Sequence, residues 1–257
     1  MLAEIQRRVF TPHMGIAAAL LLLTVVPGCA TKVNSSAPGF SPEAASVPRP
    51  TRVLVADFEV DPSAVRQDQG IGPRLQRSIG GGNAGGGAAI AREVQSAISE
   101  TVVSDLRQAG LPAERAGEGT TYRPGDLVVT GRVLRIDEGN RTRRMAIGFG
   151  AGKSIVEAAA DLTAIVPNGP PVLLQSYDGK ADSGRKPGMA MGASMAVAQS
   201  SVALGAVSAV TNVGGEVRRS PVGKEAESFG NRLARNIGEY AAHRGWIAAS
   251  SVPPWKR

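Results

Sequence analysis

Residues 154–166, SIVEAAADLTAIV, decide the fold class of this chain, because their apolar side chains recur at every second position. The alternate positions that are all apolar are Val156, Ala158, Ala160, Leu162, Ala164 and Val166. The positions between them include the polar residues Glu157, Asp161 and Thr163 among smaller apolar ones. A period of two sends successive side chains to opposite faces of a β-strand. The stretch therefore predicts a strand with one buried face.

The preceding residues 148–154, GFGAGKS, are similar to the phosphate-binding pattern G-x-x-x-x-G-K-[ST]. The spacing is one residue short, because the position five before Gly152 is Ile147 and not Gly148. A phosphate-binding loop also opens a helix, whose N-terminus helps to hold the phosphates, whereas this segment opens a strand. We therefore expect no nucleotide and no cofactor here. The glycines instead let the backbone turn sharply or pack closely.

Further strands are predicted on both sides of this one. Residues 167–170, PNGP, form a turn, and residues 172–177, VLLQSY, return as the partner strand. Upstream, the apolar runs at 127–136 and 52–58 predict two more strands. Residues 61–87 are polar and then glycine-rich, which is typical of a loop.

Two segments repeat apolar residues at intervals of three and four, which predicts amphipathic helices. The first spans 90–109 and is ended by Gly110; the second spans 222–241 and is ended by Gly245. The predicted fold class is therefore α/β of the α+β kind. It comprises a single mixed, largely antiparallel sheet of about four to five strands with two to three helices packed on it.

Residues 127–162, LVVTGRVLRIDEGNRTRRMAIGFGAGKSIVEAAADL, resemble the bacterial lipoproteins grouped as domain of unknown function 4410. The shared core is a strand, then DEGNR, then an arginine, then GFGAGKS leading into a strand. The resemblance extends over residues 50–248 and implies no established activity and no catalytic residues. The opening strand, which ends in Ala56, Asp57 and Phe58 before an amphipathic helix, also looks distantly like the curli-secretion lipoproteins at the level of fold.

The N-terminal residues predict export. Arg7 and Arg8 precede an apolar run at 14–26 that is too short for a membrane-spanning helix, which needs about 20 residues. This arrangement is typical of a secretory signal peptide. The next residues, VPGC, end at Cys29 and resemble the bacterial lipobox, which implies cleavage before Cys29 and acyl chains on its thiol and amino group.

The lipobox resemblance also implies a location and a domain plan. Ala30, and not Asp, follows the cysteine, which implies the periplasmic face of the outer membrane, with attachment through the acyl chains on Cys29. The chain is thus predicted to comprise a signal peptide (1–28), a disordered Ser- and Pro-rich tether (29–50), a single α/β domain (51–248) and a C-terminal tail (249–257).

Charge suggests one contact surface and excludes one partner. The chain carries 29 Lys and Arg against 22 Asp and Glu. Residues 137–144, DEGNRTRR, predict a polar turn whose Arg141, Arg143 and Arg144 are candidates for contact with anionic lipid or lipopolysaccharide. Nucleic acid is not an expected partner, because the chain is exported and only 4% of its residues are aromatic.

Residues 187–215 contain no charged side chain and predict a helix of small residues. Three roles stay open for this segment: it covers the sheet of its own domain, it contacts an envelope protein or a second copy of the chain, or it touches the membrane.

The sequence predicts a non-catalytic protein. Zinc needs three or four His, Cys or acidic ligands, whereas the chain has one cysteine and, after processing, only His243, so we expect no metal site. No G-x-S-x-G nucleophile motif occurs. The main hypothesis is a binding or assembly module of the envelope, anchored to the outer membrane. The alternative is an oligomeric secretion or pore component resembling the curli-export lipoproteins, assembled through 187–215.

Overall fold

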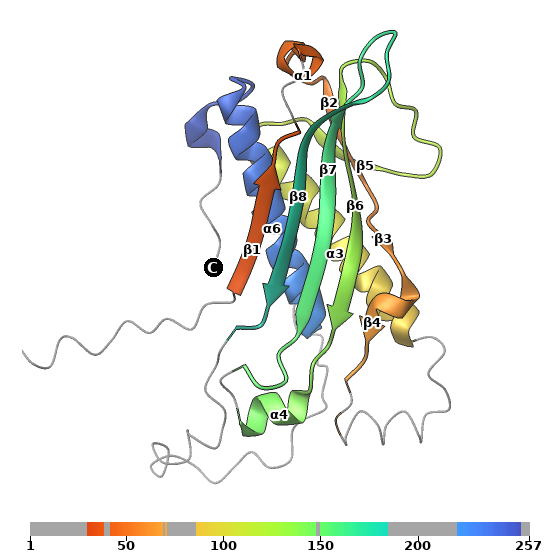
Figure 1. Ribbon diagram of the computed structural model, residues 1–257, viewed down its shortest axis with the longest axis vertical. Helices are drawn as coiled ribbons and strands as arrows, with labels where there is room; N and C mark the ends of the chain where they lie inside the picture. Colours follow the sequence, from red (N-terminus) through yellow and green to blue (C-terminus); the bar gives the residue numbers. More distant parts are fainter. Residues whose placement is uncertain are drawn as a thin grey trace, which may run out of the picture.

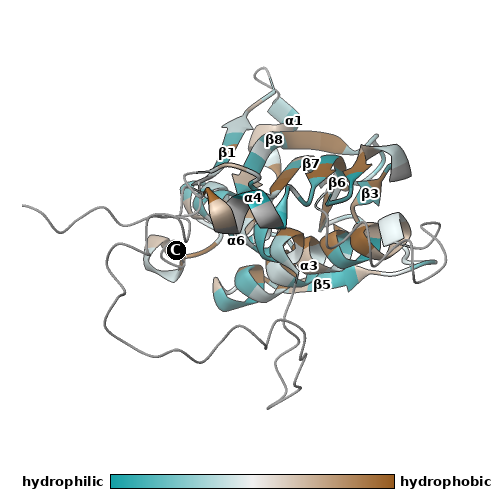
Figure 2. Ribbon diagram, turned by 90° about the horizontal axis from the view of Figure 1, so that it is seen from below, coloured by the Kyte–Doolittle hydropathy of each residue, from teal (hydrophilic) through white to brown (hydrophobic). Residues whose placement is uncertain are grey.

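The computed structural model describes residues 30–38, 42–68, 70, 86–147, 150–184 and 220–252. These residues form an α+β domain in which a mixed sheet of eight strands carries two long helices on one face (Figures 1 and 2). The predicted fold class is confirmed, although the sheet has eight strands where the sequence indicated about four to five.

The sheet is antiparallel on one side of its longest strand and parallel on the other. Its strands are β1 (Ala30–Ser36), β2 (Arg52–Ala56), β3 (Glu59–Val60), β4 (Val65–Arg66), β5 (Ala113–Ala116), β6 (Asp126–Asp137), β7 (Ile155–Ala164) and β8 (Val172–Asp182). They follow the order β1-β8-β7-β6-β2-β5, with β3 and β4 also paired to β6. The pairs β1–β8, β8–β7 and β7–β6 are antiparallel, whereas β2, β3 and β4 run parallel to β6.

The helices α3 (Gly86–Gln108) and α6 (Pro221–His243) pack against each other and against the same face of the sheet (Figure 2). The chain turns at Gly110 and Gly245, with φ of 86° and 69°, so both predicted helices end at the predicted glycines. The shorter elements are α1 (Pro42–Ser46), α4 (Arg141–Ala146) and the 3₁₀ turns η1 (Pro62–Ala64) and η2 (Ala249–Ser251).

The core lies between the sheet and these two helices. Every second residue of β7 from Val156 to Ala164 is buried in it, which confirms the predicted period of two. Phe58 and Phe229 meet edge to face at its centre, with ring centroids 6.4 Å apart. A β-carbon on Gly131 would lie 2.2 Å from the Phe58 ring, so the glycine in β6 makes room for that side chain.

The other face of the sheet carries polar side chains that pair across strands. Glu157 of β7 lies 3.2 Å from the Lys180 ammonium of β8 and 3.9 Å from the Arg135 guanidinium of β6. An antiparallel sheet that faces water on one side is expected to alternate in this way. Within the described part of the chain, no helix combines the length and the apolar character that crossing a bilayer requires.

The N-terminal segment is ordered, so the predicted disordered tether at 29–50 is wrong for most of its length. β1 pairs with β8 over seven positions, from Ala30 opposite Asp182 to Ser36 opposite Ser176. The Asn236 side-chain amide of α6 donates a hydrogen bond to the Val33 carbonyl, 3.1 Å away. Val33 is the only large apolar residue of this strand. Composition therefore did not reveal a strand that is held by backbone pairing.

Arg244 fixes the short helix α1 to the end of α6. Its guanidinium donates to the carbonyls of Ala44, Ala45 and Val47 at 2.7, 3.0 and 2.9 Å. The same group lies over the Trp246 ring, 5.1 Å from its centroid. Trp246 is itself buried in the core. The chain from β1 to β2 is therefore attached to α6 at two places.

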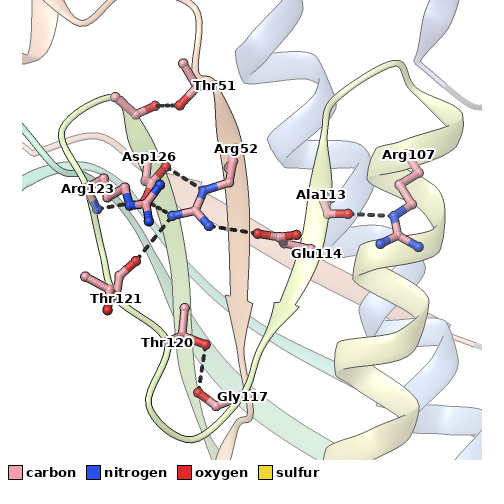
Figure 3. Close-up of polar contacts among 11 residues, drawn as sticks. Thr51, Arg52, Arg107, Ala113, Glu114, Gly117, Thr120, Thr121, Arg123 and Asp126 are labelled. Atoms are coloured by element: carbon pink, nitrogen blue, oxygen red, sulfur yellow. Dashed lines mark hydrogen bonds and ion pairs between the residues drawn. The ribbon is translucent and has the colours of Figure 1, made fainter.

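A second ion-pair network closes the opposite end of the sheet from α4 (Figure 3). The Arg52 guanidinium of β2 donates two hydrogen bonds, of 3.0 and 2.6 Å, to the Asp126 carboxylate at the start of β6. It also pairs with Glu114 at 3.1 Å. The Asp126 side chain is only 1% exposed. The hydrogen bonds from Arg52, aided by the backbone N–H of Arg123, hold the pKa of Asp126 below its ordinary value.

Replacing Asp126 with Asn is expected to lower the free energy of unfolding by about 1.5–3 kcal/mol at pH 7, the usual range for hydrogen bonds to a charged group. The folded-state pKa of Asp126 is depressed, so its contribution is complete above the unfolded pKa of about 3.9 and is lost as the pH falls through the folded value. Urea denaturation of both proteins from neutral to acidic pH measures this. The difference should shrink on acidification, and a constant difference would refute the assignment. Glu118→Gln, in an exposed turn, serves as the control.

Candidate functional site

Two turns that carry the motifs DEGNR (137–141) and GFGAGKS (148–154) pack against each other at one end of the sheet. The Asn140 N–H donates to the Gly152 carbonyl at 3.0 Å. Gly139 and Gly152 both have φ of 70°. A β-carbon on Gly139 would lie 2.3 Å from the Gly152 oxygen, and one on Gly152 would lie 2.5 Å from the Asn140 oxygen. Glycine alone permits this approach, which confirms the predicted close packing.

The lysine and serine of GFGAGKS join three elements together. The Lys153 ammonium lies 2.7 Å from the Asp182 carboxylate at the end of β8. The Ser154 hydroxyl donates to Glu225 of α6 at 3.2 Å, and both residues are buried. The motif opens the strand β7 and not a helix, as the sequence predicted. The Lys153 ammonium is thus bound by the buried Asp182 carboxylate. In a phosphate-binding loop, by contrast, the motif lies at the N-terminus of a helix.

Asp68 is a further buried residue of this site, and the sequence gave it no role beyond a polar loop. Its carboxylate accepts hydrogen bonds from the backbone N–H groups of Gly70 and Arg141, at 2.7 and 3.0 Å. Its own N–H donates to the Glu138 side chain at 3.0 Å. The only local signal is the Asp-x-Gly spacing, which favours a side-chain-capped turn. The contact with Arg141, far along the chain, has no signal in the sequence.

The three candidate arginines lie in the short helix α4, which corrects the predicted polar turn. Asn140 caps this helix, because its side chain accepts a hydrogen bond from the Arg143 N–H at 2.9 Å. The side chains of Arg141 and Arg143 are exposed, whereas that of Arg144 lies outside the described residues. Ile147 follows the helix and is 53% exposed. No carboxylate in the described part of the chain forms an ion pair with Arg141 or Arg143.

The register of the sheet places the start of β1 at the same end as α4. Ala30 pairs with Asp182, Asp182 with Ile155, and Ile155 with Asp137, so the four residues form one row across the sheet. Three steps of about 4.8 Å separate Ala30 from Asp137 by about 14 Å. Figure 1 shows α4 beyond this end of the sheet. Cys29 lies outside the described residues, but it directly precedes Ala30 in the chain.

The predicted helix at 187–215 also lies outside the described residues. Residues on either side of this segment, Ser183 and Ser220, are described. Ser183, just after β8, donates its N–H to the Ser154 carbonyl at 3.1 Å, and Ser220 caps the start of α6. Both therefore lie at the α4 end of the sheet.

The chemistry available in the described residues is limited. Among them, no three His, Cys, Asp or Glu side chains lie close enough to hold a metal ion. A groove of about 590 Å³ lies on the polar face of the sheet, lined by residues of β1, β7 and β8 together with Leu134. Several of its charged side chains bind neighbouring residues: Lys180 binds Glu157 at 3.2 Å, and Asp178 binds Asn34 at 3.0 Å. His243 is exposed at the end of α6.

Comparison with known proteins gives structural likenesses and a family. The chain is similar to the PelC dodecamer from Paraburkholderia phytofirmans, with 16% sequence identity and a TM-score of 0.32, over 62% of this chain and 88% of that one. A single-residue variant of that PelC dodecamer gives 15% identity and a TM-score of 0.30, over 64% and 90% of the two chains. Both structures are of PelC, whereas the sequence suggested the curli-secretion lipoproteins. The search of curated proteins gives no match.

The family comparison agrees with the motifs on which the sequence resemblance rested. The matching family model spans residues 53–203, which include both motif turns and more than half of the chain. Its description is Domain of unknown function (DUF4410), and the chain belongs to that family.

Proposed function

We propose that the protein is a non-catalytic lipoprotein of the cell envelope, held at the periplasmic face of the outer membrane by acyl chains on Cys29. It acts there as a binding or assembly module. The observation that carries this proposal is the VPGC motif, which ends at Cys29 after a short apolar run. The structure adds that the residues which follow, Ala30–Ser36, are part of the sheet.

The polar groups of the two motif turns support a structural role over a catalytic one. Lys153 is engaged by Asp182, and Ser154 by Glu225. Catalysis needs a nucleophile or proton donor that can reach a substrate. Here the serine and its carboxylate partner are buried, at 0% and 3% exposure.

Labelling with palmitate tests the proposal. We expect the wild type to incorporate label and to sediment with membranes, because several acyl chains anchor a protein far more firmly than one. Cys29→Ser should lose both properties. A second variant, Cys29→Ser with Ser35→Cys, keeps one cysteine but places it in exposed β1 and should also stay unlabelled. An unlabelled wild type, or unchanged labelling of Cys29→Ser, would exclude lipidation at this residue.

A second candidate function is that of an oligomeric secretion or pore component. One observation favours it: β1 is an edge strand that pairs with β8 alone among the described strands. Edge strands present backbone groups that can pair with another chain. Size in mild detergent separates the two functions, because a monomer supports the tethered module and a large ring supports the channel.

A further inference from the structure

We propose that α4 and Ile147 form a membrane-docking surface for anionic phospholipid headgroups, which acts together with the acyl chains on Cys29. This inference rests on the proposed function, since it places the same membrane against a second part of the domain. The docking surface is defined as Arg141, Arg143 and Ile147. Two contacts at one end of the sheet would fix the orientation of the domain on the bilayer.

The docking surface and the start of β1 lie at the same end of the sheet. Ala30 is about 14 Å, or three strand spacings, from Asp137, the last residue of β6 before α4. β1 cannot swing away from that end, because it pairs with β8 over seven positions and accepts a hydrogen bond from Asn236. The anchor is therefore joined to the sheet without a flexible linker, and α4 extends beyond the sheet on that side (Figure 1).

The exposed side chains of the docking surface suit an anionic lipid surface. Guanidinium groups bind phosphate through two parallel hydrogen bonds, and exposed basic residues near a bilayer are attracted to anionic lipid. Arg141 and Arg143 are exposed, and the large apolar side chain of Ile147 is 53% exposed beside them. Basic residues next to an exposed apolar one are typical of segments that lie in the interface between headgroups and acyl chains.

The acidic groups near α4 contact partners other than the Arg141 and Arg143 side chains: Glu138, for example, accepts a hydrogen bond from the Asp68 N–H at 3.0 Å. Asp182 binds Lys153 at 2.7 Å, and Asp137 binds Arg135 at 2.9 Å. Asp68 accepts backbone N–H groups, including that of Arg141, and is 8% exposed. The outer surface of α4 therefore presents Arg141 and Arg143.

A fluorescent probe on the lipidated protein tests the proposal. Cys29 is the only cysteine and would be acylated, so Ile147→Cys provides a single thiol for an environment-sensitive dye. The control is Tyr122→Cys, which is 46% exposed in the turn before β6, at the opposite end of the sheet. In nanodiscs containing phosphatidylglycerol, we expect a lipid-borne quencher to quench the probe at 147 several-fold more than the probe at 122.

Charge and linker variants sharpen the test. Replacing Arg141 and Arg143 with Ala should abolish most of the quenching at 147, as should nanodiscs of phosphatidylcholine alone or high salt. Replacing Arg49 and Arg123 with Ala removes the same charge from the opposite end of the sheet, where both are exposed. This control should leave the quenching at 147 unchanged. A Gly-Ser linker between Cys29 and Ala30 should weaken the quenching by lowering the effective concentration of α4 at the bilayer.

Equal quenching at 147 and 122 in a protein that carries palmitate would overturn the docking surface and leave the proposed lipid anchor intact. If quenching at 147 is unchanged by the arginine replacements, by the lipid charge and by the salt concentration, the proposed recognition of anionic headgroups is wrong. Absence of palmitate would instead overturn the proposed function on which the inference rests.

Discussion

Replacement of Phe229 by alanine is expected to lower the free energy of unfolding by about 3–5 kcal/mol, the range for large aromatic residues in protein cores. Phe229 is fully buried on α6 and meets Phe58 edge to face, with ring centroids 6.4 Å apart. Its removal leaves a cavity between α6 and the sheet, because close-packed neighbours collapse into such a space only in part. Urea denaturation followed by circular dichroism measures the loss.

The control for this prediction is Tyr122→Ala. Tyr122 is 46% exposed, and its removal should change the free energy of unfolding by no more than about 0.5 kcal/mol. A loss below about 1 kcal/mol for Phe229→Ala would show that α6 does not pack on the sheet as described.

The second large effect is expected at the glycines of the two motif turns. Gly139→Ala and Gly152→Ala should each cost more than about 2 kcal/mol, because strain at an unfavourable backbone angle and overpacking add. Both glycines have φ of 70°, and their β-carbons would lie 2.3 and 2.5 Å from backbone oxygens. Equilibrium denaturation of each variant measures the cost.

Gly119 separates these two causes. It has φ of 80° but nothing within 4 Å of its β-carbon position, so Gly119→Ala should cost only about 1 kcal/mol. If Gly139→Ala costs no more than Gly119→Ala, the turns do not pack as tightly as described, and the glycines serve the backbone angle alone.

The elements with a clear period were predictable from the sequence. The alternation at 154–166 gave β7, and the apolar stripes at 90–109 and 222–241 gave α3 and α6. In each, the apolar residues face the same core, so local pattern and tertiary packing agree.

Elements that depend on contacts far along the chain were not predictable. β1 has one large apolar residue, Val33, and is held by β8 and by Asn236. The strands β3 and β4 have two residues each and exist because β6 offers them an edge. A hydrophobic period can be recognised only over several residues, and a strand of two residues is too short to show one.

The candidate site was predictable in part. The sequence singled out the arginines of α4 and the glycines of GFGAGKS, but it did not place either beside the start of β1. That proximity follows from the register through β8, β7 and β6, which no local pattern encodes. The Asn140 cap was the available signal for α4, since asparagine is a preferred residue at a helix N-terminus.

The N-terminal peptide of protein purified from native membranes tests the lipid anchor most directly. Mass spectrometry should find that this peptide begins at Cys29 and carries the added mass of acyl chains, followed at once by the residues of β1. A peptide that begins at Met1, or a Cys29 without acyl chains, would contradict the account.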